Sequence, residues 1–369
     1  MSLQKRTFSL YSVSEARNVI FGIATLWIGL FHSAGLSLAP YFGKGFLNSC
    51  FVFVRSKGNV GVDMFLFLSG IGLFFSFSND SNLKSFWKKR LMRVLPTALL
   101  IGTIYFSIRY ITGRESTGLL FYLSRVSFLH FFFTGERVFW FISLILVLYL
   151  LFPLIYKAIV RFGGKGTAVM VVGIVVLNFL LRWLAPSLYS MWEVALCRIP
   201  VFIVGIWLGR YIKEKREISR KWLWAFLGAA ILMIVFLYFL PRIRLLINPA
   251  YDKSMEQMYM FLYRYAGSVL AVMLVLLDSF VITAIRRTGH CNVLRNIFEF
   301  IGLYSMEYYM IYLNLIHYLE RIYKPFPAYH QPMLCVGCCI ISIVLCVAAR
   351  KFCDFFMAYM QKKPKKTTS

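Results

Sequence analysis

Four ionisable side chains lie within long apolar stretches of the sequence: His32, Asp63, Arg182 and Glu307. If these stretches cross a bilayer, a charge near its centre costs ~3 kcal/mol on insertion scales. Residues kept at such a cost are candidates for chemistry or for transport. The alternative for each of them is a structural hydrogen bond between helices.

His32 and Asp63 are expected at a similar depth. At 1.5 Å per residue, His32 lies ~20 Å from the inner start of its helix. Asp63 lies ~24 Å from the inner side of a ~30 Å apolar core. A carboxylate beside a histidine orients the ring and stabilises its charged form, which is a common arrangement for a general base. The depths therefore predict a catalytic pair in the outer half of the membrane.

A basic cluster follows the second apolar stretch, in the segment Lys88–Arg93, which reads KKRLMR. Arg90 and Arg93 are three residues apart, so on a helix they share a face. Two guanidinium groups on one face suit phosphate groups. The alternative is that the cluster only anchors the helix end at the inner surface of the membrane.

The elements that must position these residues are membrane-spanning helices. Of the 369 residues, 60% are hydrophobic and 15% are charged, which is too little charge to cover a soluble domain of this size. The apolar runs are continuous rather than alternating, which favours helices over barrel strands. We predict an all-α, polytopic integral membrane protein with about ten transmembrane helices. The expected spans are 19–40, 59–78, 94–112, 138–156, 167–184, 198–212, 222–241, 263–285, 298–318 and 333–353.

Two apolar segments between these spans are not expected to cross the membrane. Phe46–Val54 is too short, so we place it in an outer loop or as a re-entrant segment. Gly118–Thr134 carries Arg125 and His130 and is typical of an interfacial helix.

Lys and Arg residues set the expected orientation. With the N-terminus inside, every inner segment is basic, so both termini are predicted on the cytoplasmic side of the inner (plasma) membrane. The net charge of +26 then reflects topology and contacts with anionic membrane lipids rather than nucleic acid.

The chain is predicted to form a single domain. No composition shift, repeat or linker divides residues 1–360, and residues 361–369 are expected to be a basic cytoplasmic tail. The first apolar segment lacks a small-residue cleavage site, so it is expected to be retained. Cys335 and Cys338 have the spacing of a metal or redox motif, but they lie in an apolar span with no His nearby in sequence. Packing is therefore favoured over a metal site.

Three motifs in the first hundred residues resemble those of one family. The most specific is Gly61–Gly70, which reads GVDMFLFLSG and is similar to the family's GVDxFFxLSG. Phe86–Pro96 is similar to its F…RxxR…P element, and Phe31-His32 ends the first helix as the family's catalytic His does. In these motifs the chain resembles the membrane-bound acyltransferase 3 family, which includes bacterial surface-sugar O-acetyltransferases. Weaker matches are Trp140–Ile142, Arg198–Gly205 and Ser305–Tyr309.

The chain departs from the family pattern at two positions. An Arg commonly lies eleven residues before the family's His, where this chain has Phe21, and the nearest candidate is Arg17. The ninth helix often carries a His where this chain has Tyr312.

The resemblance implies an O-acyltransferase that takes its acyl group, most often acetyl, from acyl-CoA as donor substrate, with no bound cofactor and no metal. Arg90 and Arg93 would hold the CoA phosphates. His32, with Asp63, would activate a hydroxyl of an extracytoplasmic glycan or lipid-linked sugar, or would relay the acyl group covalently. Candidates for supporting roles are Arg17, Ser69 and Glu307.

The competing class is a proton-coupled transporter or flippase of an envelope precursor, since buried His, Asp and Glu residues suit proton transport. The sequence contains no inverted repeat and no paired Gly- or Pro-broken helices, which argues against it. Transfer of a radiolabel from acetyl-CoA to surface glycan distinguishes the two classes.

Overall fold

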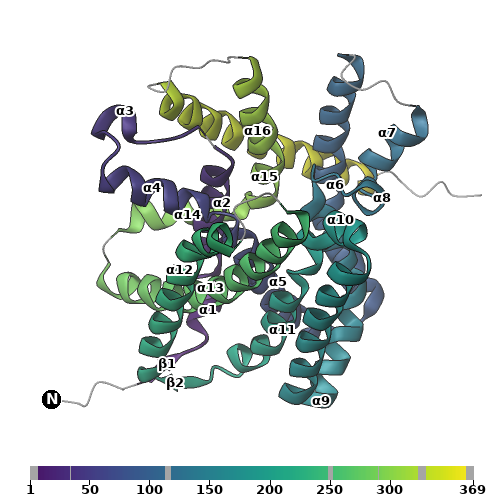
Figure 1. Ribbon diagram of the computed structural model, residues 1–369. Helices are drawn as coiled ribbons and strands as arrows, with labels where there is room; N and C mark the ends of the chain where they lie inside the picture. The colour runs from purple at the N-terminus through teal and green to yellow at the C-terminus, as the bar shows by residue number, and fades with distance from the viewer. Residues whose placement is uncertain are drawn as a thin grey trace, which may run out of the picture.

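The computed structural model describes six stretches of the chain, namely residues 7–33, 35–112, 118–247, 252–289, 291–322 and 330–362. Nearly all of these residues are helical (Figure 1). Most of the predicted 361–369 tail lies outside them. The long helices are α5 (Val60–Asn79), α6 (Leu83–Ile111), α9 (Trp140–Leu184), α11 (Ile199–Lys213), α12 (Lys221–Ile247), α13 (Lys253–Thr288), α15 (Ser305–Ile322) and α16 (Gln331–Lys362).

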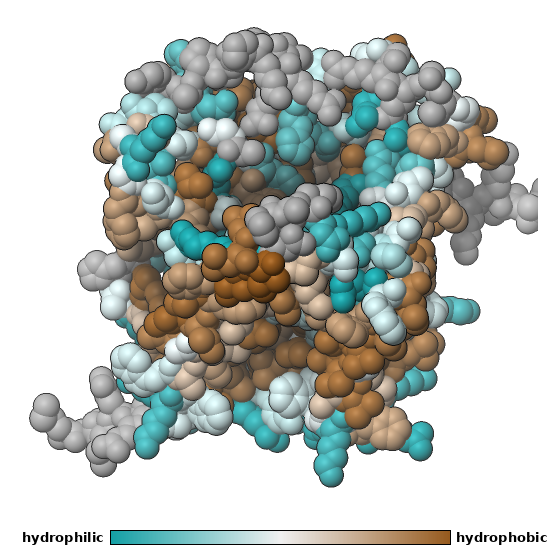
Figure 2. Space-filling view, in the orientation of Figure 1, coloured by the Kyte–Doolittle hydropathy of each residue, from teal (hydrophilic) through white to brown (hydrophobic). Residues whose placement is uncertain are grey.

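Seven ranges of the described chain are long and apolar enough to cross a membrane: α5, α6, α9, α10 (Pro186–Leu196) together with α11, α12, α13 and α16. The predicted all-α, polytopic membrane fold is confirmed. The side chains of α12 and α16 lie mostly on the surface and are largely apolar. Figure 2 shows apolar side chains covering the middle of one face, with hydrophilic ones toward its upper and lower edges. This is the pattern of a surface that meets lipid.

Helix α9 contains two crossings. As one straight helix, its 45 residues would be ~68 Å long, more than twice the ~30 Å apolar core. Gly163 interrupts it with φ +60° and ψ −145°, a conformation that favours glycine. Its two halves match the predicted spans 138–156 and 167–184.

Two predicted spans need correction. The first, 19–40, is helix α2 (Arg17–His32), which ends at His32. The ninth, 298–318, is interrupted at Tyr304, between α14 (Asn292–Leu303) and α15. Arg350 Nη1 donates to the Leu303 carbonyl at 2.6 Å, and this carbonyl belongs to the last turn of α14, where helix carbonyls lack partners. Counting both halves of α9, and adding α2 and the α14–α15 pair to the seven ranges, gives ten helical segments in the described chain, close to the predicted number of spans.

The first described residues, from Thr7, lie beside the connection between α11 and α12. Strand β1 (Thr7–Ser9) pairs antiparallel with β2 (Glu217–Ser219), as Figure 1 shows next to the N label. Lys213 Nζ donates to Ser78 Oγ at 2.8 Å and to Asn79 Oδ1 at 2.6 Å, which brings the end of α5 to the same place. We call this side of the helix bundle the N-terminal side and the opposite one the far side.

Glycines allow two helix pairs to pack backbone against backbone. A Cβ at Gly205 of α11 would lie 2.2 Å from the Phe67 carbonyl oxygen of α5. A Cβ at Gly302 of α14 would lie 2.0 Å from the Asn18 oxygen of α2. Helices α5 and α2 are thereby held at the centre of the bundle, where they carry Asp63 and His32.

Short helices cap the bundle on the far side. The predicted outer segment 46–54 is helix α4 (Phe46–Ser56), preceded by α3 (Ala39–Phe42). The predicted interfacial helix over 118–134 is two short helices, α7 (Leu119–Val126) and α8 (His130–Thr134). The remaining short helix is α1 (Ser12–Glu15), next to β1.

Candidate functional site

A cavity of about 250 Å³ runs inside the bundle between α2, α5, α6, α9, α15 and α16. Along α2 it extends from Arg17 to Gly29, a distance of ~18 Å at the helical rise. Its walls between these ends are mainly apolar and include Phe65, Leu73 and Ile145. The cavity therefore has a long apolar middle between two ends of different chemistry.

Four arginines line the end of the cavity nearest the N-terminal side: Arg17, Arg90, Arg93 and Arg350. Glu307 is the one carboxylate in the cavity lining within the described chain, and its Oε1 lies 3.4 Å from Arg350 Nε. Among the described residues, three positive charges are thus left without a carboxylate in a partly desolvated space, and an anion would offset them. This end is a candidate phosphate site.

The local sequence after α5 fixes the two predicted phosphate arginines. Asn82 caps α6 by accepting from the Ser85 amide at 3.0 Å, and Asp80 accepts from Ser85 Oγ at 2.8 Å and Lys89 Nζ at 3.0 Å. These contacts hold the pKa of Asp80 down to about 2. Because α6 begins at Leu83, Arg90 and Arg93 lie on one helix, and both line the same cavity.

Arg17 joins them from the first helix. Its guanidinium lies against Gly72 of α5, where an added Cβ would be 2.7 Å from Arg17 Nη2. It also lies 5.0 Å from the centre of the Phe21 ring. The absence of a side chain at Gly72 thus makes room for Arg17, which the sequence had marked only as the nearest candidate.

Two stacked tyrosines close the other end of the cavity. The rings of Tyr308 and Tyr312 lie 5.1 Å apart and nearly parallel. Tyr312 Oη and Ser33 Oγ are 2.8 Å apart, and a Cβ at Gly29 would lie 3.2 Å from the Tyr312 ring. A hydrogen-bonded pair therefore separates the cavity from the residues beyond Ser33.

His32 is immediately adjacent to this closure. It is the last residue of α2 and is half-buried. Its ring lies 5.6 Å from the ring of His317 on α15, with the planes inclined by 71°. Fifteen residues separate His32 from Arg17, or ~22 Å along the helix. The imidazole pair and the arginines thus lie at opposite ends of one path.

Asp63 is bound elsewhere than predicted. Ser268 Oγ donates to its Oδ1 at 2.6 Å, and Arg198 Nε lies 3.3 Å from its Oδ2. The depth of Asp63 relative to His32 could be estimated from the sequence, but the direction in which its helix faces could not. Asp63 faces α11 and α13, so its expected contact with His32 is replaced by one with Arg198.

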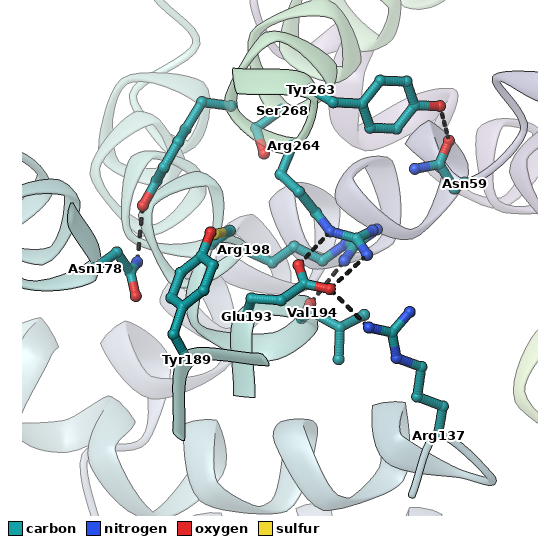
Figure 3. A network of polar contacts seen from close by, with 12 residues as sticks. Asn59, Arg137, Asn178, Tyr189, Glu193, Val194, Arg198, Tyr263, Arg264 and Ser268 are labelled. Atoms are coloured by element: carbon teal, nitrogen blue, oxygen red, sulfur yellow. Dashed lines mark hydrogen bonds and ion pairs between the residues drawn. The ribbon is translucent and has the colours of Figure 1, made fainter. Parts of the chain in front are cut away.

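Asp63 belongs to a buried polar network. Arg264 donates two hydrogen bonds to Glu193, at 2.7 and 3.1 Å, and Arg137 donates a third at 2.9 Å (Figure 3). Arg198 donates to the Val194 carbonyl at 2.6 Å. Buried carboxylates with such partners join α10, α11 and α13. We assign this network to holding the bundle together.

Of the other predicted residues, some line the cavity and some make structural contacts between helices. Ser69 and Glu307 line the cavity. Arg182 instead donates to the Ser254 carbonyl at 3.4 Å, which joins the end of α9 to the start of α13. Cys335 and Cys338 pack in a buried cluster with Tyr308 and Tyr312.

A family model described as an acyltransferase domain, Acyl_transf_3, matches residues 19–351. The chain belongs to the acyltransferase 3 family. The predicted resemblance is confirmed, and this protein is a membrane acyltransferase. The match includes His32, the arginine end of the cavity apart from Arg17, and both stacked tyrosines. No curated protein and no solved structure matches the chain.

Two residues of this acyltransferase site were not identified from the sequence. Arg350 was counted only among the basic residues of an inner segment, and its place in the cavity depends on how α16 packs. His317 lies in an apolar stretch of the ninth span, so the criterion that selected His32 also selects it.

Proposed function

We propose that this acyltransferase moves an acyl group, in the simplest case acetyl, from cytoplasmic acyl-CoA to a hydroxyl of an extracytoplasmic glycan or lipid-linked sugar. The observation that carries the proposal is the cavity that leads from four arginines to the closure beside His32. It offers one continuous path for a long donor with an anionic end and a reactive end.

The dimensions of the cavity support acyl-CoA as donor. The pantetheine arm has the length of roughly four extended residues, or ~14 Å. With the phosphates at Arg17, Arg90 and Arg93, the arm would lie along the apolar middle. The thioester would then reach Gly29 and Tyr312, one helical turn from His32. CoA is used here as a substrate, and we assign no bound cofactor.

In this scheme His32 is the general base. The acceptor hydroxyl gives its proton to a His32 nitrogen as its oxygen attacks the thioester carbonyl. The new C–O bond forms, the C–S bond breaks, and the thiolate takes up the proton from His32. The Ser33–Tyr312 hydrogen bond must open for the thioester to reach the acceptor.

The proposal also orients the protein. The N-terminal side faces the cytoplasm, where acyl-CoA is available, and the far side faces the acceptor. Both termini are then cytoplasmic in the inner (plasma) membrane. Anionic lipids would meet the basic segments on the N-terminal side.

Radiolabel transfer tests the proposal. Membranes containing the protein are supplied with acetyl-CoA labelled in the acetyl group, and the extracted glycan and lipid-linked sugar fractions are counted. Labelled ester that is absent from membranes lacking the protein is the expected result. Mass spectrometry of surface glycans from cells with and without the protein then identifies the acceptor. Movement of an unmodified precursor with no labelled ester would favour the transporter.

A further inference from the structure

We infer that His317 is a positioning residue for His32, which holds the His32 ring in the orientation and tautomer that let it accept a proton from the acceptor hydroxyl. This inference rests on the proposed acyl transfer. It gives a role to a residue that neither the family motifs nor the cavity lining includes.

The geometry brings the two rings within reach of each other. Two imidazoles joined by an N–H···N hydrogen bond have centroids ~5 Å apart, and those of His32 and His317 are 5.6 Å apart. The rings are therefore close enough for an N–H···N hydrogen bond when a nitrogen of each faces the other. His32 is the last residue of α2. The Phe31 ring lies 5.1 Å from its ring but offers no hydrogen-bond acceptor, whereas His317 of the neighbouring helix α15 offers a ring nitrogen.

Asp63, the carboxylate that the sequence predicted to orient the His32 ring, binds other residues. Asp63 accepts from Ser268 and pairs with Arg198, and its side chain is buried. Releasing it would leave the Arg198 guanidinium buried without its charged partner, which is strongly unfavourable. Asp63 is therefore poorly placed to leave Arg198 and orient His32.

His317 acts through His32 and does not itself touch the reacting atoms. One His32 nitrogen must be free of hydrogen to accept the hydroxyl proton, so its N–H must be on the other nitrogen. A His317 nitrogen that accepts this N–H fixes the tautomer and the ring angle together. The proton taken from the acceptor leaves with the CoA thiol, so both imidazoles return to their starting state.

The test compares His317→Ala with the wild-type protein in acyl transfer normalised to folded protein. We expect kcat to fall ~10–100-fold, the range for a misplaced catalytic group. The KM for acyl-CoA should stay unchanged, because the phosphate site is at the other end of the cavity. Added imidazole should restore part of kcat in His317→Ala. Asn314→Ala is the matched control, since Asn314 lies on the same helix and its Nδ2 donates to the Met310 carbonyl at 2.5 Å; it should have wild-type kcat.

The outcomes separate this inference from the proposed function. Wild-type kcat in His317→Ala, with His32→Ala inactive, overturns the positioning role and leaves acyl transfer intact. An active His32→Ala overturns the general-base role of His32 and with it the positioning role of His317, whereas absence of labelled ester with the wild-type protein overturns acyl transfer itself. A kcat that falls in His317→Ala and in Asn314→Ala alike, with no rescue by imidazole, shows that α15 has only been disturbed and also overturns the role. If His317→Ala does not accumulate, His317→Phe, which keeps a ring but cannot accept a hydrogen bond, carries the same kinetic comparison.

Discussion

The arginine end of the cavity should respond to Arg17→Ala in two opposite ways. The cavity holds four arginines, Arg17, Arg90, Arg93 and Arg350, and among the described residues that line it Glu307 is the one carboxylate. In the empty protein the guanidinium groups repel one another, whereas bound phosphate attracts them all. Loss of one should therefore weaken donor binding and stabilise the empty protein.

The size of the binding effect follows from the hydrogen bonds that Arg17 would donate to phosphate. A hydrogen bond to a charged group contributes ~1.5–3 kcal/mol, which corresponds to a ~10–150-fold rise in the KM for acyl-CoA. Arg90→Ala and Arg93→Ala should fall in the same range. Lysine should restore binding only in part, because it cannot donate two parallel hydrogen bonds.

Two measurements on purified protein test this prediction. The KM for acyl-CoA is determined from initial rates, and the melting temperature is determined without donor and at saturating donor. Without donor, the Arg17→Ala protein should have a higher melting temperature than wild type. Addition of acyl-CoA should raise its melting temperature by less than it raises that of wild type. Arg182→Ala is the control, since Arg182 lies outside the cavity and contacts the Ser254 carbonyl. An unchanged KM with a lowered melting temperature would refute the phosphate site and leave the arginines as structural residues.

Three further predictions concern structural contacts outside the cavity. Gly205→Ala should destabilise the protein by several kcal/mol or prevent its accumulation, because its Cβ would lie 2.2 Å from the Phe67 carbonyl oxygen; normal yield and melting temperature would contradict the α5–α11 contact. Asp63→Asn should lower stability by ~3–5 kcal/mol by leaving Arg198 buried without a charged partner, measured by denaturation in detergent; reduced activity at unchanged stability would point back to a direct role with His32. The pKa of Asp80 is held near 2 in the folded protein against ~3.9 in the unfolded chain, so its contribution to stability is complete above pH 4 and is lost as the pH falls toward 2. The melting temperature, measured at several pH values between 5 and 2, should therefore fall less steeply with pH for Asp80→Asn than for wild type. An identical pH dependence of the two melting temperatures would contradict this prediction.

Much of the fold is readable from the sequence because apolar length determines which segments cross the membrane. The short first helix and the break at Tyr304 are exceptions for a physical reason. Helix α14 ends at Leu303, whose carbonyl accepts a hydrogen bond from Arg350. Arg350 lies 47 residues further along the chain. Hydropathy along the sequence cannot reveal such a contact.

The site was predictable in part for a related reason. Arg90 and Arg93 could be paired from their spacing on one helix, and the structure brings both to the cavity. The pairing of His32 depends on how α2, α5 and α15 rotate against each other. Glycines set those rotations by allowing close contacts such as that of Gly302 with Asn18. Depth alone therefore favoured Asp63, while packing brings His317 to His32.

Acyl transfer by His32→Ala, expressed per folded molecule, tests the central claim most directly. Acetyl-CoA labelled in the acetyl group is supplied to membranes, and folded protein is quantified by size-exclusion chromatography of the solubilised protein. Loss of a general base should reduce the transfer rate ~10²–10⁴-fold, while folded yield and the KM for acyl-CoA stay close to wild type. A transfer rate near wild type in His32→Ala would contradict the account, because a group other than His32 would then have to activate the acceptor hydroxyl.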